Sequence, residues 1–277
     1  MNLHFDLAAM IWLADHRMSW LTSLLAVVAR LGDVEGYIVV STFIYVAYDK
    51  TLGVRLTLIA SLTMCLNHAL KLVIANPRPF ILEGTHLWRW AVSPEQVHAL
   101  AAEFSTPSGN AMTAAAFYTY LYAVVRVGWV RATAIVSILG IGMARPYLGV
   151  HYIEDILIGW SLGILCGLIA ISQENNIAEL WRVISIKWRT ATAIAAGPLV
   201  VLAFAIVRWQ IDLQPRLLLG YVGAATGVLI GRHLELRLVS FDPQSGTWAS
   251  KLVRFVLTIA IALGVLSGLG RVCATVA

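Results

Sequence analysis

Long apolar runs, separated by short breaks of charged residues, Pro or Gly, divide this sequence along its whole length. A helix needs roughly 20 apolar residues, and about 17 at the least, to cross the hydrocarbon core of a bilayer. Applied to these runs, that rule predicts about nine spans. The predicted spans are residues 18–30, 35–48, 52–74, 109–127, 131–143, 151–171, 189–209, 215–231 and 252–272. We therefore expect an all-α fold, a polytopic transmembrane helical bundle.

The composition agrees with a chain that lies in the bilayer. Hydrophobic residues make up 59% of it and charged residues 13%, and the mean hydropathy is +0.79, which is not the balance of a soluble domain. The net charge of +5 comes from single basic residues between apolar runs. We therefore expect no nucleic-acid partner. Residues 1–17 lack the basic start of a cleavable signal peptide, and Cys65, Cys166 and Cys273 lie in apolar runs without metal-ligand spacing.

We expect a single membrane domain over residues 1–277, without internal repeats. Residues 5–16 alternate apolar and polar positions at helical spacing and are expected to lie along the interface. The longest segment outside the bilayer, residues 76–106, contains Trp88 and Trp90, which suit the headgroup zone. In the same segment, Ser93 as a cap predicts a short surface helix to about residue 104.

Basic residues in alternate loops predict the orientation. One side would hold Arg17, Lys50, Arg55, Arg126, Arg131, Arg182, Lys187, Arg189, Arg232, Arg237, Lys251 and Arg254. The other side would hold Arg30, Lys71, Arg78, Arg89, Arg145, Arg208, Arg216 and Arg271. The first side is the richer in basic residues and is predicted to be cytoplasmic, so residues 76–106 and 145–150 are expected to face outward together.

Three short segments on that outward side carry residues suited to chemistry. KLVIANPRP places Lys71 and Arg78 around the end of one helix, and TPSGN places Ser108 and Gly109 at the start of the next predicted span. ARPYLGVHYIED is predicted to hold Arg145 in a tight loop and to open a further helix with a histidine and an aspartate, His151 and Asp155. Taken singly, such residues are most often membrane anchors, helix caps or surface pairs.

Taken together, the three segments predict a phosphate site. Lys71, Arg78 and Arg145 would converge where unpaired charge is costly, and a dianionic ligand would neutralise them. Gly109 would begin a helix whose free N–H groups form an anion site. Because His151 and Asp155 are one turn apart, the carboxylate can hold one ring nitrogen and aim the other at phosphorus. This combination favours phosphoryl transfer.

At these residues the sequence resembles the type 2 phosphatidic acid phosphatase superfamily, which also includes vanadium haloperoxidases and glucose-6-phosphatases. The family pattern is Lys-x6-Arg-Pro, Pro-Ser-Gly-His and Arg-x5-His-x3-Asp. Lys71 and Arg78 match the first motif and Arg145, His151 and Asp155 match the third, within residues 52–171.

The resemblance implies a six-helix phosphatase core over residues 18–171 and about three additional transmembrane helices within residues 172–277. It implies that His151 is the nucleophile that forms a phosphohistidine and that Asp155 orients it. It implies no metal and no cofactor. The phosphate-binding residues that it implies are Lys71, Arg78, Ser108, Gly109 and Arg145.

The second motif departs from the family, because Asn110 stands where the family has the histidine that serves as general acid. Asparagine cannot carry a proton, and the loss of a positioned acid or base costs about 10²–10⁴-fold in rate. The substitution could be deliberate and trap the enzyme with its ligand, or the chain could be a natural lipid-phosphate binder. Alternatively, the substrate is a diphosphate, whose leaving group has a pKa of about 6 and needs little protonation. Neither His86 nor His98 stands at a matching position.

We expect a membrane lipid phosphate or diphosphate phosphatase, slowed or inactivated by Asn110, in a bacterial inner membrane with its site on the periplasmic side. Its partners would be the bilayer and a lipid phosphate such as phosphatidic acid, phosphatidylglycerol phosphate, an isoprenyl phosphate or diphosphate, or a phosphorylated lipid A. A lipid phosphotransferase is a close variant, and a non-catalytic lipid-phosphate binder or transporter is the alternative. Transporters often have internal repeats and broken midplane helices, whereas here the cations lie at a rim. The sequence leaves the oligomeric state open.

Overall fold

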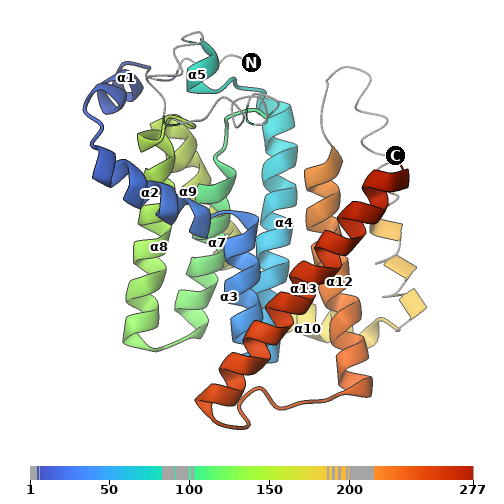
Figure 1. Ribbon diagram of the computed structural model, residues 1–277. Coiled ribbons are helices and arrows are strands. Elements are labelled where there is room, and N and C mark those ends of the chain that lie inside the picture. Colours follow the sequence, from blue (N-terminus) through green and yellow to red (C-terminus); the bar gives the residue numbers. More distant parts are fainter. Residues whose placement is uncertain are drawn as a thin grey trace.

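The computed structural model describes residues 5, 7–82, 91, 100, 103–185 and 215–276, with 187–188, 191–192, 195–197 and 199 between them. Within these residues every regular element is a helix (Figure 1), which confirms the all-α prediction. The helices are α1 Leu7–Asp15, α2 Ser19–Leu31, α3 Val34–Ala47, α4 Lys50–Ile74, α5 Pro79–Leu82, α7 Gly109–Val124, α8 Gly128–Tyr147, α9 Ile153–Ser172, α10 Glu174–Val183, α12 Pro215–Leu238 and α13 Trp248–Val276.

All predicted spans but one coincide with helices to within a few residues at most ends. The exception, residues 189–209, lies mostly outside the described residues, as does the surface helix predicted after Ser93, and both stay predictions. By length and composition alone, three described helical segments are sufficient to cross a membrane: Lys50–Ile81, Ile153–Ser172 and Trp248–Val265. The short helices α5 and α10 were not predicted.

The position of α2 corrects two predictions. α2 has 13 residues and α3 has 14, but only α3 runs along the axis of the bundle in Figure 1. Before its start, Met18 N donates to Tyr147 Oη at 2.8 Å, and Arg17 Nε donates to Tyr147 O at 3.2 Å. α2 therefore lies obliquely near the upper end of the bundle in Figure 1 and is not a separate crossing. Arg17 consequently lies on the same side as Arg145, and not on the opposite side as predicted.

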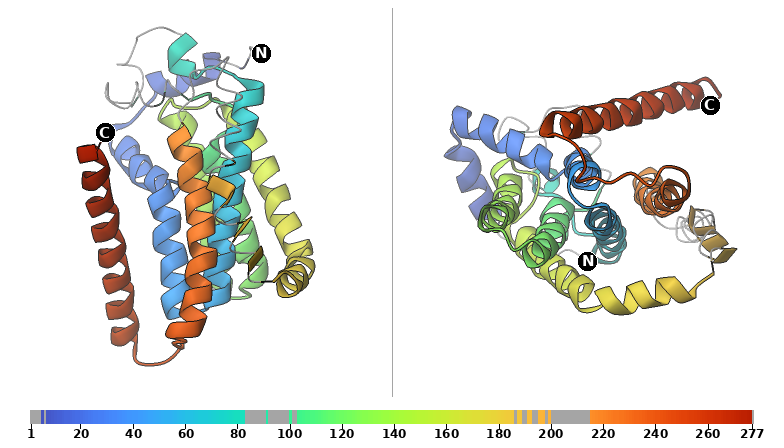
Figure 2. Two further views of the ribbon diagram at one scale, coloured as in Figure 1. Left: turned by 90° about the vertical axis from the view of Figure 1, so that its right-hand side faces the viewer. Right: turned by 90° about the horizontal axis from the view of Figure 1, so that it is seen from below.

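The crossing helices alternate in direction around α7. α4 and α8 end at the upper end of Figure 1, whereas α7 and α9 begin there, and α3 runs downward beside α4 (Figures 1 and 2). α7 is packed against α4, α8 and α9, and its residues Ala114–Phe117 are fully buried. The upper ends of α4, α8 and α9 thus meet around the start of α7.

Small residues bring α9 close to α7. Gly159, Gly163 and Gly167 recur at every fourth position of α9. A Cβ on Gly159 would lie 3.0 Å from Ser108 O, and one on Gly163 would overlap Met112 O. Such small residues allow membrane helices to pack with their backbones close together. Because of this contact the starts of the two helices adjoin, and Ser108 N donates to the main-chain oxygen of a residue in the first turn of α9 at 3.1 Å.

The C-terminal helices lie on the outside of this core. α12 packs against α4 and α13 against α3, and Figure 2 shows α13 at the periphery of the bundle. At the lower end, Glu235 of α12 accepts from Lys50 at 2.6 Å and also pairs with Arg232. Arg254 of α13 donates to Val46 O at 3.0 Å. α10 runs across the same end of the bundle (Figure 2).

Candidate active site

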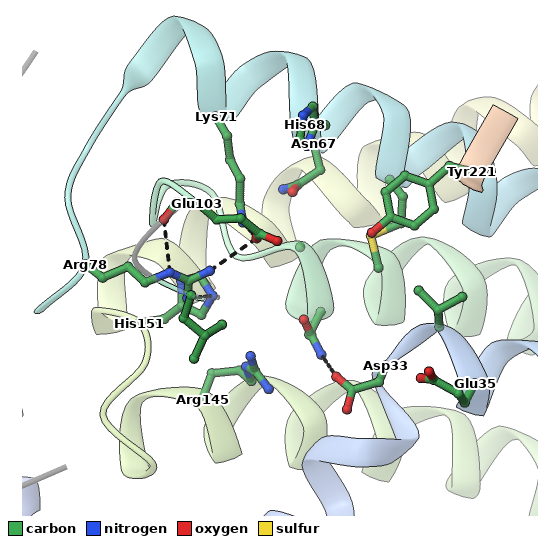
Figure 3. Close-up of a pocket in the computed structure, with 16 residues that line it drawn as sticks. Asp33, Glu35, Asn67, His68, Lys71, Arg78, Glu103, Arg145, His151 and Tyr221 are labelled. Atoms are coloured by element: carbon green, nitrogen blue, oxygen red, sulfur yellow. Dashed lines mark hydrogen bonds and ion pairs between the residues drawn. The ribbon is translucent and has the colours of Figure 1, made fainter. Parts of the chain in front are cut away.

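The predicted site residues come from different elements and meet in and beside one pocket near the upper end of the core (Figure 3). Lys71 lies in the last turn of α4, Arg145 in the last turn of α8, and His151 just before α9. The pocket lining includes Lys71, Arg78, Gly109, Asn110, Arg145 and His151. The remaining two, Ser108 and Asp155, lie behind them and are fully buried.

His151 is held between a carboxylate and a cation. Its Nδ1 lies 3.2 Å from Asp155 Oδ2, and its Nε2 lies 3.2 Å from Arg78 Nη1. A guanidinium only donates, so Nε2 accepts and the ring proton is on Nδ1, facing the carboxylate. Burial and the charge of Arg78 lower the pKa of His151 to about 3. The imidazole is therefore neutral at physiological pH, with its lone pair on the nitrogen that faces the pocket.

Asp155 is itself fixed by neighbours that the sequence did not single out. Its Oδ1 accepts from Thr106 Oγ1 at 2.5 Å, and its Oδ2 accepts from Ser105 Oγ and from Tyr152 N, the latter at 2.9 Å. Ser105 and Thr106 are fully buried. They directly precede the Pro-Ser-Gly motif, and this adjacency was the signal that could have revealed them. They hold the carboxylate in the orientation that contacts His151.

An unpredicted carboxylate, Glu103, connects two of the predicted cations. Its Oε2 lies 3.0 Å from Lys71 Nζ and 3.3 Å from Arg78 Nη2, and Arg78 Nε donates to its main-chain oxygen at 3.1 Å. Arg78 and Lys71 have 1% and 8% of their side chains exposed. Burial alone would raise the pKa of Glu103, but the charges of Lys71 and Arg78 outweigh this effect and lower it. Glu103 is thus an anion among cations that could otherwise bind phosphate.

Arg145 differs in placement from the prediction. It belongs to α8, with Pro146 also inside the helix, and does not lie in a tight loop, because the helix continues to Tyr147. Among the described residues, Arg145 Nε and Ser108 Oγ are buried without a hydrogen-bond partner. A buried polar atom without a partner costs about 1–3 kcal/mol. Ligand oxygens are groups that could satisfy such atoms.

The start of α7 is shaped by a residue of α4. Asn67 Nδ2 donates to Pro107 O at 3.0 Å, and a Cβ on Gly109 would lie 2.9 Å from Asn67 Oδ1. The absence of a side chain at Gly109 therefore lets the turn pack against α4. The Ser108 side chain makes no capping bond to α7.

Asn110 does not stand alone in the pocket. Its Nδ2 donates to Asp33 Oδ1 at 2.8 Å. Asp33 is the N-cap residue of α3, yet its side chain makes no capping hydrogen bond to that helix. Sequence reasoning missed Asp33 because it belongs to a segment far from all three motifs, and only the folded chain brings it to Asn110.

A neutral, oriented imidazole beside buried cations and a helix start, in a helical membrane bundle, is an arrangement suited to a membrane phosphatase. The comparisons with known proteins give the family. The chain belongs to the PAP2 superfamily, which it matches over residues 52–179, and residues 219–276 match the transmembrane extension of PAP2 superfamily phosphatases. It is therefore a membrane lipid phosphatase of the PAP2 type, that is, a phosphate-ester hydrolase.

Individual relatives agree with this assignment. Undecaprenyl-diphosphatase of Sulfolobus acidocaldarius is 23% identical over 178 residues, which are 63% of this chain and 81% of the relative. Phosphatidylglycerophosphatase B of Bacillus subtilis is 29% identical over 174 residues, 58% of this chain and 79% of the relative. The crystal structure of Aquifex aeolicus LpxE has a TM-score of 0.52 at 26% identity and covers 62% of this chain and 99% of its own. A crystal structure of a Bacillus subtilis phosphatidylglycerolphosphate phosphatase has a TM-score of 0.50, also at 26% identity, and covers 62% and 85%.

Proposed function

We propose that this protein removes a terminal phosphate from a membrane lipid phosphate or diphosphate through a phosphohistidine on His151. The observation that carries the proposal is the hydrogen-bonded pair of Asp155 and neutral His151, with Nε2 facing the pocket that Lys71, Arg78 and Arg145 line. Nε2 attacks phosphorus as the bond to the leaving oxygen breaks. The cations neutralise charge on the phosphoryl oxygens, and Asp155 stabilises the ring as it becomes cationic.

Glu103 adds a condition to substrate binding. It occupies the space between Lys71 and Arg78, so an incoming phosphate has to compete with its carboxylate for both cations. Arg78 also has to give up its hydrogen bond to Nε2, which frees the lone pair that attacks. The movement of Arg78 from Nε2 to the phosphate thus both binds the substrate and activates the nucleophile.

Asn110 bears on the choice of substrate. Because asparagine cannot protonate a leaving oxygen, an alkyl monophosphate should be cleaved about 10²–10⁴-fold more slowly than with a histidine. A lipid diphosphate leaves a phosphate with a pKa of about 6, which needs little protonation. Among the relatives, undecaprenyl-diphosphatase is named for such a substrate. We therefore favour a lipid diphosphate.

A panel experiment tests the proposal. Phosphate release from lipid monophosphates and from a prenyl diphosphate is measured for the unchanged protein and for Asn110→His. We expect the unchanged protein to prefer the diphosphate, and Asn110→His to increase monophosphate release far more than diphosphate release. Equal cleavage of both classes by the unchanged protein would contradict the diphosphate hypothesis. If neither form releases phosphate while lipid phosphates still bind, the chain is a binder and the hydrolase mechanism is wrong.

We further propose that the site faces outward from the cytoplasm, in a bacterial inner membrane. The support is the charge distribution: Lys50, Arg131, Arg232 and Lys251 lie at or near helix ends at the lower end, opposite the site, and basic loops favour the cytoplasm. A membrane-impermeant thiol reagent should label a cysteine placed at Gln244, between α12 and α13, only in inside-out vesicles. Labelling in right-side-out vesicles would reverse the assignment.

A further inference from the structure

The pocket contains a carboxylate that stands beside the position of the missing histidine. Asp33 is the N-cap of α3, where an aspartate would ordinarily accept a hydrogen bond from its own helix. Here it makes no such bond and instead accepts from Asn110 Nδ2 at 2.8 Å. Its side chain lines the same pocket as His151. The fold thus gives up about 1 kcal/mol of capping and directs this carboxylate into the site.

The geometry points to Asp33 as the general base of the second chemical step, the hydrolysis of the phosphohistidine. This inference rests on the proposed function. Phosphoryl transfer places the attacking and leaving groups roughly in line on opposite sides of phosphorus. In Figure 3, His151 lies at one side of the pocket and Asp33 at another, with Arg145 between them. Water would enter from the side on which the leaving group departed, which is the side of Asp33 and Asn110.

The step balances with groups already in the site. Asp33 accepts a proton from water, and the water oxygen forms a bond to phosphorus as the bond between phosphorus and His151 Nε2 breaks. The electron pair of that bond returns to Nε2 as its lone pair. Inorganic phosphate then leaves, and Asp33 releases the proton to bulk water. The products are the starting enzyme, phosphate and a proton.

Other pocket residues are less suited to this step. Asn110 has no basic oxygen that can take up a proton near neutral pH, and its hydrogen bond can only orient the carboxylate. Glu103 is engaged by Lys71 and Arg78, which favour its charged form and oppose protonation. Glu35 also lines the pocket but is exposed. Asp33 is a carboxylate that lines the pocket and accepts a hydrogen bond from Asn110, which stands where the family has its histidine.

A labelling experiment with Asp33→Asn tests the inference. The probe is a prenyl diphosphate carrying radioactive phosphorus in its terminal phosphate. We expect phosphate release to fall by about 10²–10⁴-fold, while acid-labile, base-stable label accumulates on the protein. The label accumulates because its formation needs no base, whereas its removal does. Glu179→Gln removes an exposed carboxylate of α10, at the opposite end of the bundle, and should leave both readings unchanged.

Each outcome separates the inference from the proposed function. If Asp33→Asn releases phosphate within about threefold of the unchanged protein, against the roughly 10²-fold loss expected at the least, Asp33 is not the base. If release falls without accumulation of label, Asp33 acts before the phosphohistidine forms, and the inference is wrong. If the unchanged protein and Asn110→His both fail to release phosphate or to take up label, the proposed function itself fails.

Chemical rescue provides a second arm should Asp33→Asn not fold. Asp33→Ala leaves space beside Asn110 that formate, a small carboxylate, can enter. Formate is expected to increase phosphate release by Asp33→Ala at least about tenfold, which is only part of the rate enhancement that a positioned base contributes. Formate should have no effect on phosphate release by His151→Gln. Orthovanadate should raise the melting temperature of Asp33→Ala as much as that of the unchanged protein if the variant is folded. If such a folded variant shows no rescue by formate, the inference is wrong.

Discussion

The phosphatase core and the C-terminal helices are held together in different ways. In the core, α9 approaches α7 so closely that a Cβ on Gly163 would overlap a main-chain oxygen. In α12, by contrast, Gly220, Gly223 and Gly227 have no heavy atom within 4 Å of the position of a Cβ, and no residue in the apolar stretch Trp248–Val265 of α13 is buried. The core therefore fixes its site by tight packing, whereas these three glycines of α12 and much of α13 have no close neighbours in the protein.

A pair of carboxylates shows the same contrast. Glu103 contacts Lys71 and Arg78 in the site, and Glu235 contacts Lys50 and Arg232 at the lower end. Both bridge two cations. The first occupies a place that a ligand could take, whereas the second joins α12 to the start of α4. A carboxylate between two cations thus competes with the ligand in the site, whereas at the lower end it holds α12 against α4.

The largest contrast is expected for two histidines. His151→Gln removes the nucleophile, so phosphate release should fall by at least about 10³-fold and no label should attach to the protein. His233→Gln changes a histidine of α12 and should leave release unchanged. Both are measured with the terminally labelled prenyl diphosphate. Label that persists in His151→Gln would show that another residue is the nucleophile.

The next contrast is between two glycine substitutions that should change the free energy of unfolding in opposite directions. Gly163→Ala forces α9 away from α7 and should destabilise the protein by about 1–3 kcal/mol. Gly227→Ala adds a methyl in open space and should stabilise α12 by up to about 1 kcal/mol. Thermal unfolding in detergent measures both. If the unfolding temperatures of both variants shift in the same direction, tight packing of α7 on α9 does not distinguish the core from the C-terminal helices.

The comparison also shows which features a sequence reveals. Helix positions were predictable because apolar length determines them, and the three motifs predicted Lys71, Arg78, Arg145 and His151 in one place. The error over α2 arose because an apolar run of 13 residues resembles a span even when the chain does not cross there. The position of Arg145 was misjudged because the predicted span ended at residue 143, whereas α8 continues through Arg145 to Tyr147.

Other site residues could not be predicted because their partners are distant in the chain. Asp33 meets Asn110 across 77 positions and Asn67 meets Pro107 across 40. Neither pair forms a local pattern, since only the packing of α3, α4 and α7 brings them together. Glu103 was a single acid in a polar segment until Lys71 was placed beside it.

A smaller contrast is expected between the two bridging carboxylates. Glu103→Gln removes the anion that competes with phosphate, so orthovanadate should bind about tenfold more tightly, as expected for the loss of a partly buried charge contact of about 1–2 kcal/mol. Glu235→Gln should lower the unfolding temperature without changing orthovanadate affinity. Titration calorimetry and thermal unfolding separate the two effects. Weaker orthovanadate binding by Glu103→Gln would mean that Glu103 orders the cations for the ligand and does not compete with it.

The smallest expected change is the absence of a titration. An ordinary histidine has a pKa near 6.5 and is about 97% protonated at pH 5. Burial and the charge of Arg78 lower the pKa of His151 to about 3, so the neutral form should persist as the pH falls from 7 to 5. Nitrogen NMR of histidine-labelled protein measures this, with the signal assigned by its loss in His151→Gln. A titration of that signal near pH 6.5 would mean that Asp155 stabilises the imidazolium enough to outweigh burial and Arg78. Protons would then compete with phosphorus for the lone pair of His151 Nε2 near neutral pH.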